Sequence, residues 1–156
     1  MSSVSFVIPV FNKEKYLTYV LDSLHNQTGS FKREFIFIND GSTDGSLELL
    51  RSKTKDWKNC KIVSQENRGS AAATNVGIKL ARNKYIKFLD ADDLILYSAT
   101  EKLLGIIDGN KSINLVYGLQ RKVKDFSKVD LNLKINSSDL IKIKDPIKSA
   151  MTNSMF

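Results

Sequence analysis

Three carboxylates follow an apolar stretch in the middle of the chain. Tyr85–Leu89 is rich in aliphatic and aromatic residues, and Asp90, Asp92 and Asp93 come directly after it. The stretch predicts a buried strand with the acids at its carboxyl end, the edge where open α/β sheets bind ligands. Two carboxylates about 4 Å apart repel by roughly 4 kcal/mol at an effective dielectric of 20. A divalent cation or open solvent would offset that repulsion.

An isolated Asp-x-Asp is more often an acidic turn that caps the next helix, so the surrounding elements decide between the two interpretations. Apolar runs predict five strands: Val4–Val10, Glu34–Asn39, Lys58–Ser64, the stretch from Tyr85, and Asn114–Val123. Apolar residues three and four apart predict four helices, through Leu17–Leu24, Leu47–Arg51, Ala73–Leu80 and Thr100–Ile107. This alternation predicts an α/β fold with a mainly parallel sheet and helices on both faces. Polar clusters after the first, second and fourth strands would then meet at one edge as a ligand crevice. A short helix near Leu140 is a weaker prediction.

Residues at the predicted turns have specific expected roles. Pro9 lacks a backbone N–H and should lie where strand pairing ends. Thr43 or Asp44 is placed to cap the second helix, and Ser70 is placed to cap the third. Glu14 falls in the first turn of the first helix, where a negative charge suits the helix dipole.

The composition is that of an ordinary globular protein with one core: 156 residues, 42% hydrophobic and 26% charged. The single cysteine, Cys60, excludes an internal disulfide framework and a cysteine-based zinc site. The single histidine, His25, excludes a multi-histidine metal site and is expected to be structural or exposed. We find no run of about 20 apolar residues and no secretory signal, and we expect a cytoplasmic protein.

The formal charge of +7 is unevenly spread, because residues 121–148 hold eight Lys or Arg against four Asp. Such a segment could approach phosphates or the anionic inner face of a membrane. A solvated lysine-rich face explains it equally well. No basic motif interleaved with aromatic residues occurs, so nucleic acid is not an expected partner.

Common phosphate-binding motifs are absent. The first strand is not followed by Gly-x-Gly-x-x-Gly, and the chain has no Gly-x-x-x-x-Gly-Lys-Ser/Thr, so neither a dinucleotide site nor a P-loop is supported. A carboxylate pair without a phosphate loop suits a diphosphate bridged by Mg²⁺ or Mn²⁺, which often bind through one or two carboxylates plus substrate phosphates. A nucleotide-sugar has that chemistry.

The chain resembles the donor-binding half of glycosyltransferase family 2, inverting transferases with the GT-A fold. The resemblance covers about residues 3–120. It rests on an ordered set of motifs: Val7–Asn12 with Glu14, Asp40–Asp44, Asn67–Gly69, Asn75–Ile78 and Tyr85–Asp93.

The resemblance implies a nucleotide-diphosphate sugar as donor, most simply a UDP-sugar, with Mn²⁺ or Mg²⁺ as cofactor. It implies that Asp92 binds the metal and that Asp90 contacts the metal, its bound water or the ribose. Asp40 would hydrogen-bond the base or ribose, and Phe11 would pack near the base, unless Phe11 belongs to the core. The implied donor-binding set is Pro9, Val10, Phe11, Glu14, Asp40, Asn67, Arg68, Gly69, Asn75, Asp90, Ala91 and Asp92.

Two features depart from the family. Thr74 stands where members usually carry an arginine that can reach the nucleotide, and Arg68 could substitute for it. No general base is identified, because none of the acids after residue 120 sits in a convincing motif: Asp125, Asp130, Asp139 and Asp145. We therefore expect a GT-A donor-binding core over residues 1–124. Residues 125–156 would be a basic segment leading into an acceptor-binding part beyond a truncated C-terminus.

Three functions stay open from the sequence. The first is metal-dependent transfer of a hexose-like sugar to a saccharide or lipid-linked acceptor, in polysaccharide, lipopolysaccharide or glycoconjugate synthesis. The second is a nucleotide-sugar binding module that does not transfer. The third is a peripheral membrane module that uses the basic segment.

Overall fold

The computed structural model describes residues 1–118 and 120–133, and its centre is a four-stranded parallel sheet. The strands lie in the order β3-β2-β1-β4. Their bounds are Ser3–Val10 for β1, Lys32–Asp40 for β2, Cys60–Gln65 for β3 and Tyr85–Phe88 for β4. The predicted α/β class with a mainly parallel sheet is confirmed.

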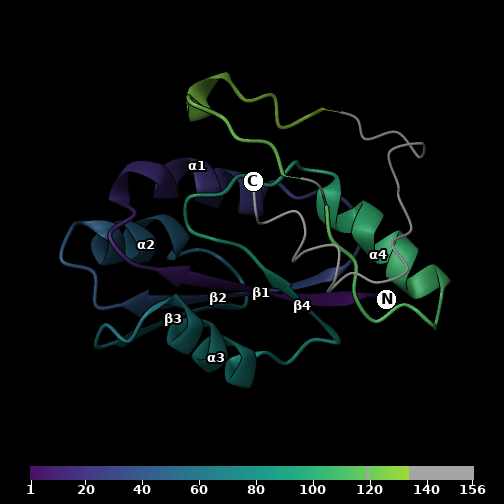
Figure 1. Ribbon diagram of the computed structural model, residues 1–156, viewed down its shortest axis with the longest axis horizontal. Coiled ribbons are helices and arrows are strands. Elements are labelled where there is room, and N and C mark those ends of the chain that lie inside the picture. The colour runs from purple at the N-terminus through teal and green to yellow at the C-terminus, as the bar shows by residue number, and fades with distance from the viewer. Residues whose placement is uncertain (119, 134–156) are drawn as a thin grey trace, which may run out of the picture.

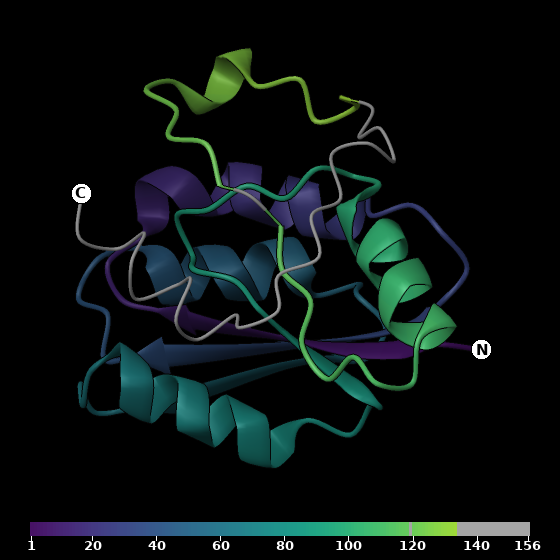
Figure 2. The same cartoon turned by 45° about the vertical axis from the view of Figure 1, so that its right-hand side comes forward.

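Helices cover both faces of the sheet (Figure 1). The pair α1 and α2 lies on one face and α3 on the other, while α4 and the short 3₁₀ helix η1 follow β4. In Figure 2 the segment around η1 lies over α1 on the side away from the sheet. The helix bounds are Glu14–His25 for α1, Ser46–Thr54 for α2, Ser70–Leu80 for α3, Ala99–Gly109 for α4 and Phe126–Lys128 for η1.

Alternation along β1 divides the core between the two faces. Phe6 and Ile8 are fully buried and pack in the cluster that includes the apolar face of α1. Val7, between them, is fully buried on the other face in the cluster with Ala73 of α3. This two-residue period is what a strand covered on both sides requires.

Helix α3 approaches the sheet closely because Gly77 has no side chain. A Cβ atom at Gly77 would lie 2.3 Å from Cγ1 of Val7, far inside van der Waals contact. Only glycine therefore allows α3 to sit at this distance from β1. The depth of α3 matters for the site, because its first residue lies at the carboxyl edge of the sheet.

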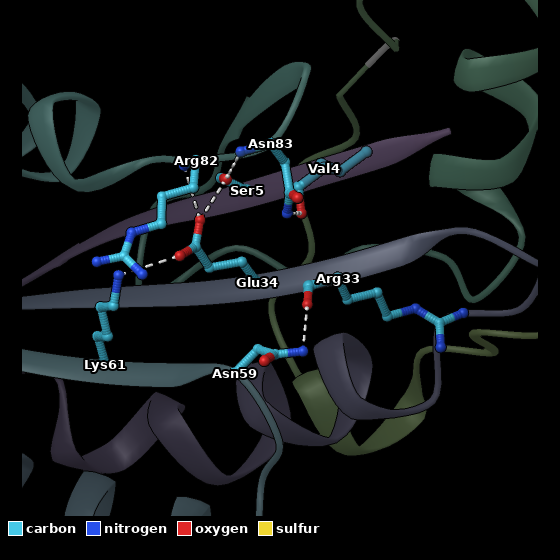
Figure 3. Close-up of polar contacts among 8 residues, drawn as sticks. All are labelled: Val4, Ser5, Arg33, Glu34, Asn59, Lys61, Arg82 and Asn83. Atoms are coloured by element: carbon cyan, nitrogen blue, oxygen red, sulfur yellow. Dashed lines mark hydrogen bonds and ion pairs between the residues drawn. The ribbon is translucent and has the colours of Figure 1, made fainter. Parts of the chain in front are cut away.

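A polar network secures the opposite, amino-terminal edge of the sheet (Figure 3). Glu34, buried on β2, accepts hydrogen bonds from Ser5 Oγ at 2.6 Å and from the Arg82 N–H at 3.0 Å. Lys61 Nζ completes the set at 3.2 Å. Burial alone would raise the pKa of Glu34, but these donors outweigh it and the pKa lies below its ordinary value. The network ties the connection between α3 and β4 to the three other strands.

Strand β4 differs from its prediction as a buried strand. Within residues 1–118 and 120–133 it is a short strand at the edge of the sheet that pairs with β1 alone, and Phe88 is 55% exposed. Its two outward residues, Ile86 and Phe88, lie on the face of α3, which reaches Val7 but leaves them uncovered. The prediction for Pro9 holds on one side of β1 only: pairing with β4 ends at Val7, before Pro9, whereas the register with β2 includes Pro9 and continues to Val10.

The predicted strand over 114–123 is wrong for its described residues, which form no strand. Leu115 and Tyr117 are exposed there, so the apolar positions have no sheet face to pack on. The predicted helix near Leu140 lies outside the described residues. Within the described part of the chain, no helix is long and apolar enough to cross a membrane.

Candidate functional site

The turn after β1 is held against the turn after β2 by one asparagine. Asn12 has a positive φ of 52°, a conformation that asparagine tolerates. Its Oδ1 accepts the backbone N–H of Thr43 at 2.8 Å and of Asp44 at 3.4 Å, while its own N–H donates to Ser42 Oγ at 3.1 Å. The carboxyl ends of β1 and β2 therefore form one rigid corner.

A reciprocal pair of acids strengthens this corner at the start of α2. Asp44 accepts the N–H of Ser46 at 2.9 Å and of Glu14 at 3.2 Å, and Glu14 accepts the N–H of Gly45 at 3.0 Å. The predicted N-cap at Thr43 or Asp44 is wrong, because the N-cap residue is Gly45, but the Asp44 carboxylate still accepts the N–H of the first helical residue, Ser46. The carboxylate of Glu14, predicted to line a nucleoside pocket, is directed to the start of α2.

Asp40, the last residue of β2, organises the loop after β3. Its carboxylate accepts Gln65 Nε2 at 2.7 Å and the backbone N–H groups of Arg68 and Gly69 at 3.0 and 2.9 Å. Burial alone would raise the pKa of Asp40, but these donors and the Arg68 charge lower it below its ordinary value. Asp40 is only 2% exposed, and its Oδ2 atom, which accepts one N–H, keeps acceptor capacity.

Two glycines shape the same loop. A Cβ atom at Gly41, where φ is +72°, would lie 2.8 Å from the backbone nitrogen of Asn67. Gly69, with φ of 87°, is the N-cap of α3, so the predicted capping by Ser70 is wrong: Ser70 is the first helical residue. Only a residue that tolerates positive φ can place its N–H on Asp40 while opening the helix.

The acidic turn after β4 joins the site through a lysine. The backbone N–H of Asp93 donates to the Asp90 carbonyl at 3.0 Å, and Asp92 forms an ion pair with the Lys13 ammonium. Burial, followed by the charges of Asp90 and Asp92, raises the pKa of Asp93, and the Lys13 charge partly opposes the rise. The predicted convergence of the three turns is therefore present as a connected set of contacts.

The remaining predicted residues fall into two groups. Phe11 is 44% exposed at the carboxyl end of β1, so the alternative that it belongs to the core does not hold, and Pro9 is half-buried beside it. Val10 and Ala91 are buried in the core and can offer a ligand only their backbone. Asn75 is exposed in the middle of α3, away from the loop at its start, while Asn67 and Arg68 are exposed in that loop.

The sequence argument missed Lys13 and Gln65, which both contact predicted acids. Lys13 is the N-cap of α1, a position where Ser, Thr, Asp or Asn is usual and where a cation opposes the helix dipole. That mismatch was the available signal. Gln65 ends β3 beside Asp40 in the parallel register, which the sequence alone does not reveal.

The carboxylates at the site supply only part of the oxygen ligands that a divalent cation needs. Across residues 1–118 and 120–133, no three His, Cys, Asp or Glu side chains are grouped to hold a metal ion. Asp92 and the exposed Asp90 would hold it, with the remaining ligands supplied by phosphate oxygens and water. Mg²⁺ commonly binds in that manner, so these residues fit a cation that arrives with a diphosphate.

The described acids after residue 120 are engaged in local turns. Asp125 accepts the N–H and hydroxyl of Ser127 at 3.0 and 2.7 Å, and these bonds lower its pKa. Asp130 accepts the N–H of Asn132 at 2.9 Å. Asp139 and Asp145 lie outside the described residues. No general base is assigned.

Known proteins resemble this chain over its larger part. The family model described as Glycosyl transferase family 2 matches residues 5–153. The minor teichoic acid biosynthesis protein GgaA of Bacillus subtilis is 37% identical over 116 residues, which cover 71% of this chain and 26% of GgaA. S. aureus TarS 1-349 in complex with UDP aligns with a TM-score of 0.63 at 31% identity, covering 70% of this chain and 32% of that one.

Another similar solved structure contains a metal ion. The mannosyltransferase PcManGT from Pyrobaculum calidifontis, in complex with GDP-Man and Mn²⁺, aligns with a TM-score of 0.56 at 26% identity. The alignment covers 59% of this chain and 28% of that one. The chain thus spans about a quarter to a third of the length of these three proteins.

Proposed function

The chain belongs to glycosyltransferase family 2, and on that premise we propose that it binds a nucleotide-diphosphate sugar at the carboxyl edge of its sheet. The sugar is transferred, with inversion, to the hydroxyl of a saccharide or lipid-linked acceptor. A UDP-sugar is the proposed donor. The site lies where β1, β2, β3 and β4 end, which is the usual ligand edge of an open α/β sheet.

The observation that carries this proposal is the linkage of the site into one preorganised frame. Asn12 locks the first two turns together, Asp40 locks the second to the loop before α3, and Lys13 reaches the acidic turn. A ligand that spans these turns meets an exposed ring at Phe11 and carboxylates at Asp92 within one frame. A nucleoside can pack on such a ring, and a diphosphate can approach the Asp92 carboxylate when a divalent cation bridges the two.

The solved relatives support the choice of donor. TarS structures hold UDP and UDP-GlcNAc, and PcManGT holds GDP-Man with Mn²⁺. GgaA acts in minor teichoic acid biosynthesis, which supports a saccharide polymer of the cell surface as the destination of the sugar. Peripheral association with the inner membrane face, through the basic segment 121–148, is the accompanying proposal for localisation.

Each contributing residue has a distinct role in this proposal. Phe11 packs against the base, while Asp40 accepts from the base or ribose and holds the loop before α3 in place. Asp92, with Asp90, would hold the divalent cation. When bound, that cation supplies neutralising charge for the leaving diphosphate. The side chain of Arg68, exposed beside Asp40, is free to approach phosphate where Thr74 replaces the usual arginine.

Transfer also needs a bound acceptor and a base within hydrogen-bond reach of the attacking hydroxyl. We assign neither function to residues 1–124, the proposed donor-binding unit. The chain covers about a third or less of the relatives reported, so we propose that these functions reside in regions the relatives have in addition. A nucleotide-sugar binding module without transfer is the second candidate function, because Asp125 and Asp130 are engaged in local turns.

A nucleotide-release assay separates the two candidates. The chain is incubated with Mn²⁺ and a panel of UDP- and GDP-sugars, with and without saccharide acceptors, beside the Asp92→Asn variant. Donor binding with at most slow hydrolysis, both lost in Asp92→Asn, is expected for the donor-binding unit alone. Acceptor-dependent release would instead assign transfer to this chain. If no donor binds under any of these conditions, the proposed function is overturned.

A further inference from the structure

Lys13 is fixed at the site by its backbone. Its N–H donates to Oγ of the fully buried Ser46 at 2.8 Å, and its carbonyl accepts the N–H groups of Tyr16 and Leu17 at 2.9 and 3.1 Å. These bonds anchor the residue as the N-cap of α1. The side chain therefore starts from a fixed backbone position from which its ammonium reaches Asp92 in the turn after β4.

The local position of Lys13 is electrostatically unfavourable without Asp92. The start of α1 carries the positive end of the helix dipole, where a cation is disfavoured. The ammonium instead pairs with Asp92 Oδ2 and lies 6.0 Å from the centre of the Tyr16 ring. Among the described residues, no other cation forms an ion pair with Asp90, Asp92 or Asp93.

The proposed metal and Lys13 would use the same carboxylate. A divalent cation held by Asp92 would lie within a few ångströms of the ammonium, and like charges at such distances repel. The lysine must therefore leave Asp92 when the cation binds. A diphosphate brought with the cation offers the released ammonium a new anionic partner.

We propose that Lys13 is a built-in counter-ion of Asp92, so that the site binds a divalent cation well only together with a diphosphate. The inference rests on the proposed metal-dependent donor site. Lys13 is a positioning residue: it weakens binding of the bare cation and favours the cation–diphosphate complex. Binding of the metal and the nucleotide is therefore cooperative, and the ammonium adds to the coupling that phosphate ligands on the cation would already provide.

The test measures Mn²⁺ binding directly, from the loss of the free Mn²⁺ electron paramagnetic resonance signal, with and without UDP. Without UDP, Lys13→Met should bind Mn²⁺ about two- to fivefold more tightly than the unchanged chain, the range for partly exposed ion pairs. With UDP, the gain in Mn²⁺ affinity should be smaller in Lys13→Met than in the unchanged chain. Lys13→Arg keeps the charge and should preserve the coupling. Lys15→Met, on the exposed side of α1, is the matched control and should change neither value.

Two failures are distinguishable. Equal Mn²⁺ affinity in Lys13→Met and the unchanged chain, including no detectable binding by either, would overturn the role of Lys13. Unchanged UDP-dependent Mn²⁺ binding in Asp92→Asn would overturn the metal site on which the inference rests.

Discussion

The Oδ2 atom of Asp40 accepts the backbone N–H of Gly69 at 2.9 Å, so the last residue of β2 holds the N-cap of α3. Replacing Asp40 with alanine removes the acceptor for two backbone N–H groups and for the Gln65 amide. We expect the free energy of unfolding to fall by about 1–3 kcal/mol, the cost of leaving part-buried donors unpaired. Urea unfolding measures this change.

The same substitution should weaken uridine binding whether or not Mn²⁺ is present, and UDP binding in Mn²⁺, because the proposed partner of Asp40 is the base or ribose and not the diphosphate. Asp56→Ala, an exposed acid after α2, is the control for loss of charge. A variant of Asp40 that is as stable as the unchanged chain and binds uridine equally well would contradict both the structural and the binding role.

The contact between Gly77 and Val7 predicts a second outcome. Gly77→Ala places a methyl group where only 2.3 Å separates it from the Val7 side chain, so α3 must move away from the sheet. We expect a loss of about 1–3 kcal/mol in unfolding free energy, the usual cost of overpacking a core. Thermal or urea unfolding measures it.

Gly105→Ala in α4 is a matched control, because nothing lies within 4 Å of a Cβ atom there. Alanine at that helical position should raise stability by about 0.5–1 kcal/mol. Equal effects of the two substitutions would show that helix propensity, and not the close approach of α3, decides the outcome.

The Glu34 network predicts how stability depends on pH. The pKa of Glu34 is lower in the folded chain than its ordinary value of 4.5, so the unfolded chain binds more protons between the two values. The stabilisation from ionised Glu34 is therefore fully present above about pH 4.5 and is lost as the pH falls through the folded pKa. Glu34→Gln should cost about 1–2 kcal/mol at pH 7.

As the pH falls below about 4.5 the difference between Glu34→Gln and the unchanged chain should shrink, because the unfolded chain takes up a proton first and this uptake removes the stabilisation from ionised Glu34. Urea unfolding at pH 7 and pH 3 compares the two, with Glu66→Gln in the exposed loop after β3 as control. A difference that stays constant with pH would show that the Glu34 charge adds no stability.

Asp92 and Asp93 are adjacent but should respond differently to substitution. Asp92→Asn removes the proposed metal ligand and should weaken Mn²⁺-dependent UDP binding. We expect a loss of about tenfold or more, the order of magnitude for losing one charged ligand. Asp93→Asn removes a carboxylate whose pKa is raised by burial and by its two acidic neighbours, and should leave that binding nearly unchanged. Calorimetric titration of UDP in Mn²⁺ ranks the two variants, and the reverse order would mean that Asp93 is the ligand.

Hydrophobic spacing was enough to predict β1, β2, β3 and β4 and the four α-helices of the described residues, because their buried side chains recur with the period of a strand or a helix. It failed where the outcome depends on neighbours distant in sequence. Whether Phe88 is buried depends on which residues cover the α3 face of the sheet beside β4. Residues 114–118 have the alternation of a strand, but they form one only if another strand pairs with them. Alternation in a sequence describes a possible strand and not its partner.

The sequence was enough to find the residue types at the site, but not the contacts that they make. Acids at strand ends were found from the sequence, yet the carboxylates of Asp40 and Glu14 bind backbone N–H groups of facing turns. Those partners are set by parallel register and by glycine conformations, which composition does not reveal. The division of the chain at residue 124 stays a prediction.

The most direct test of the account is a calorimetric titration of UDP into the chain with Mn²⁺ and again with excess chelator. The carboxylates near Asp92, and the absence of a phosphate-binding glycine motif, predict measurable binding only with the cation. At UDP a hundredfold above its dissociation constant, the chain should gain about 2.7 kcal/mol of unfolding free energy with Mn²⁺ and almost none in chelator. Equal binding and equal stabilisation in excess chelator would contradict a metal-bridged diphosphate at this edge of the sheet.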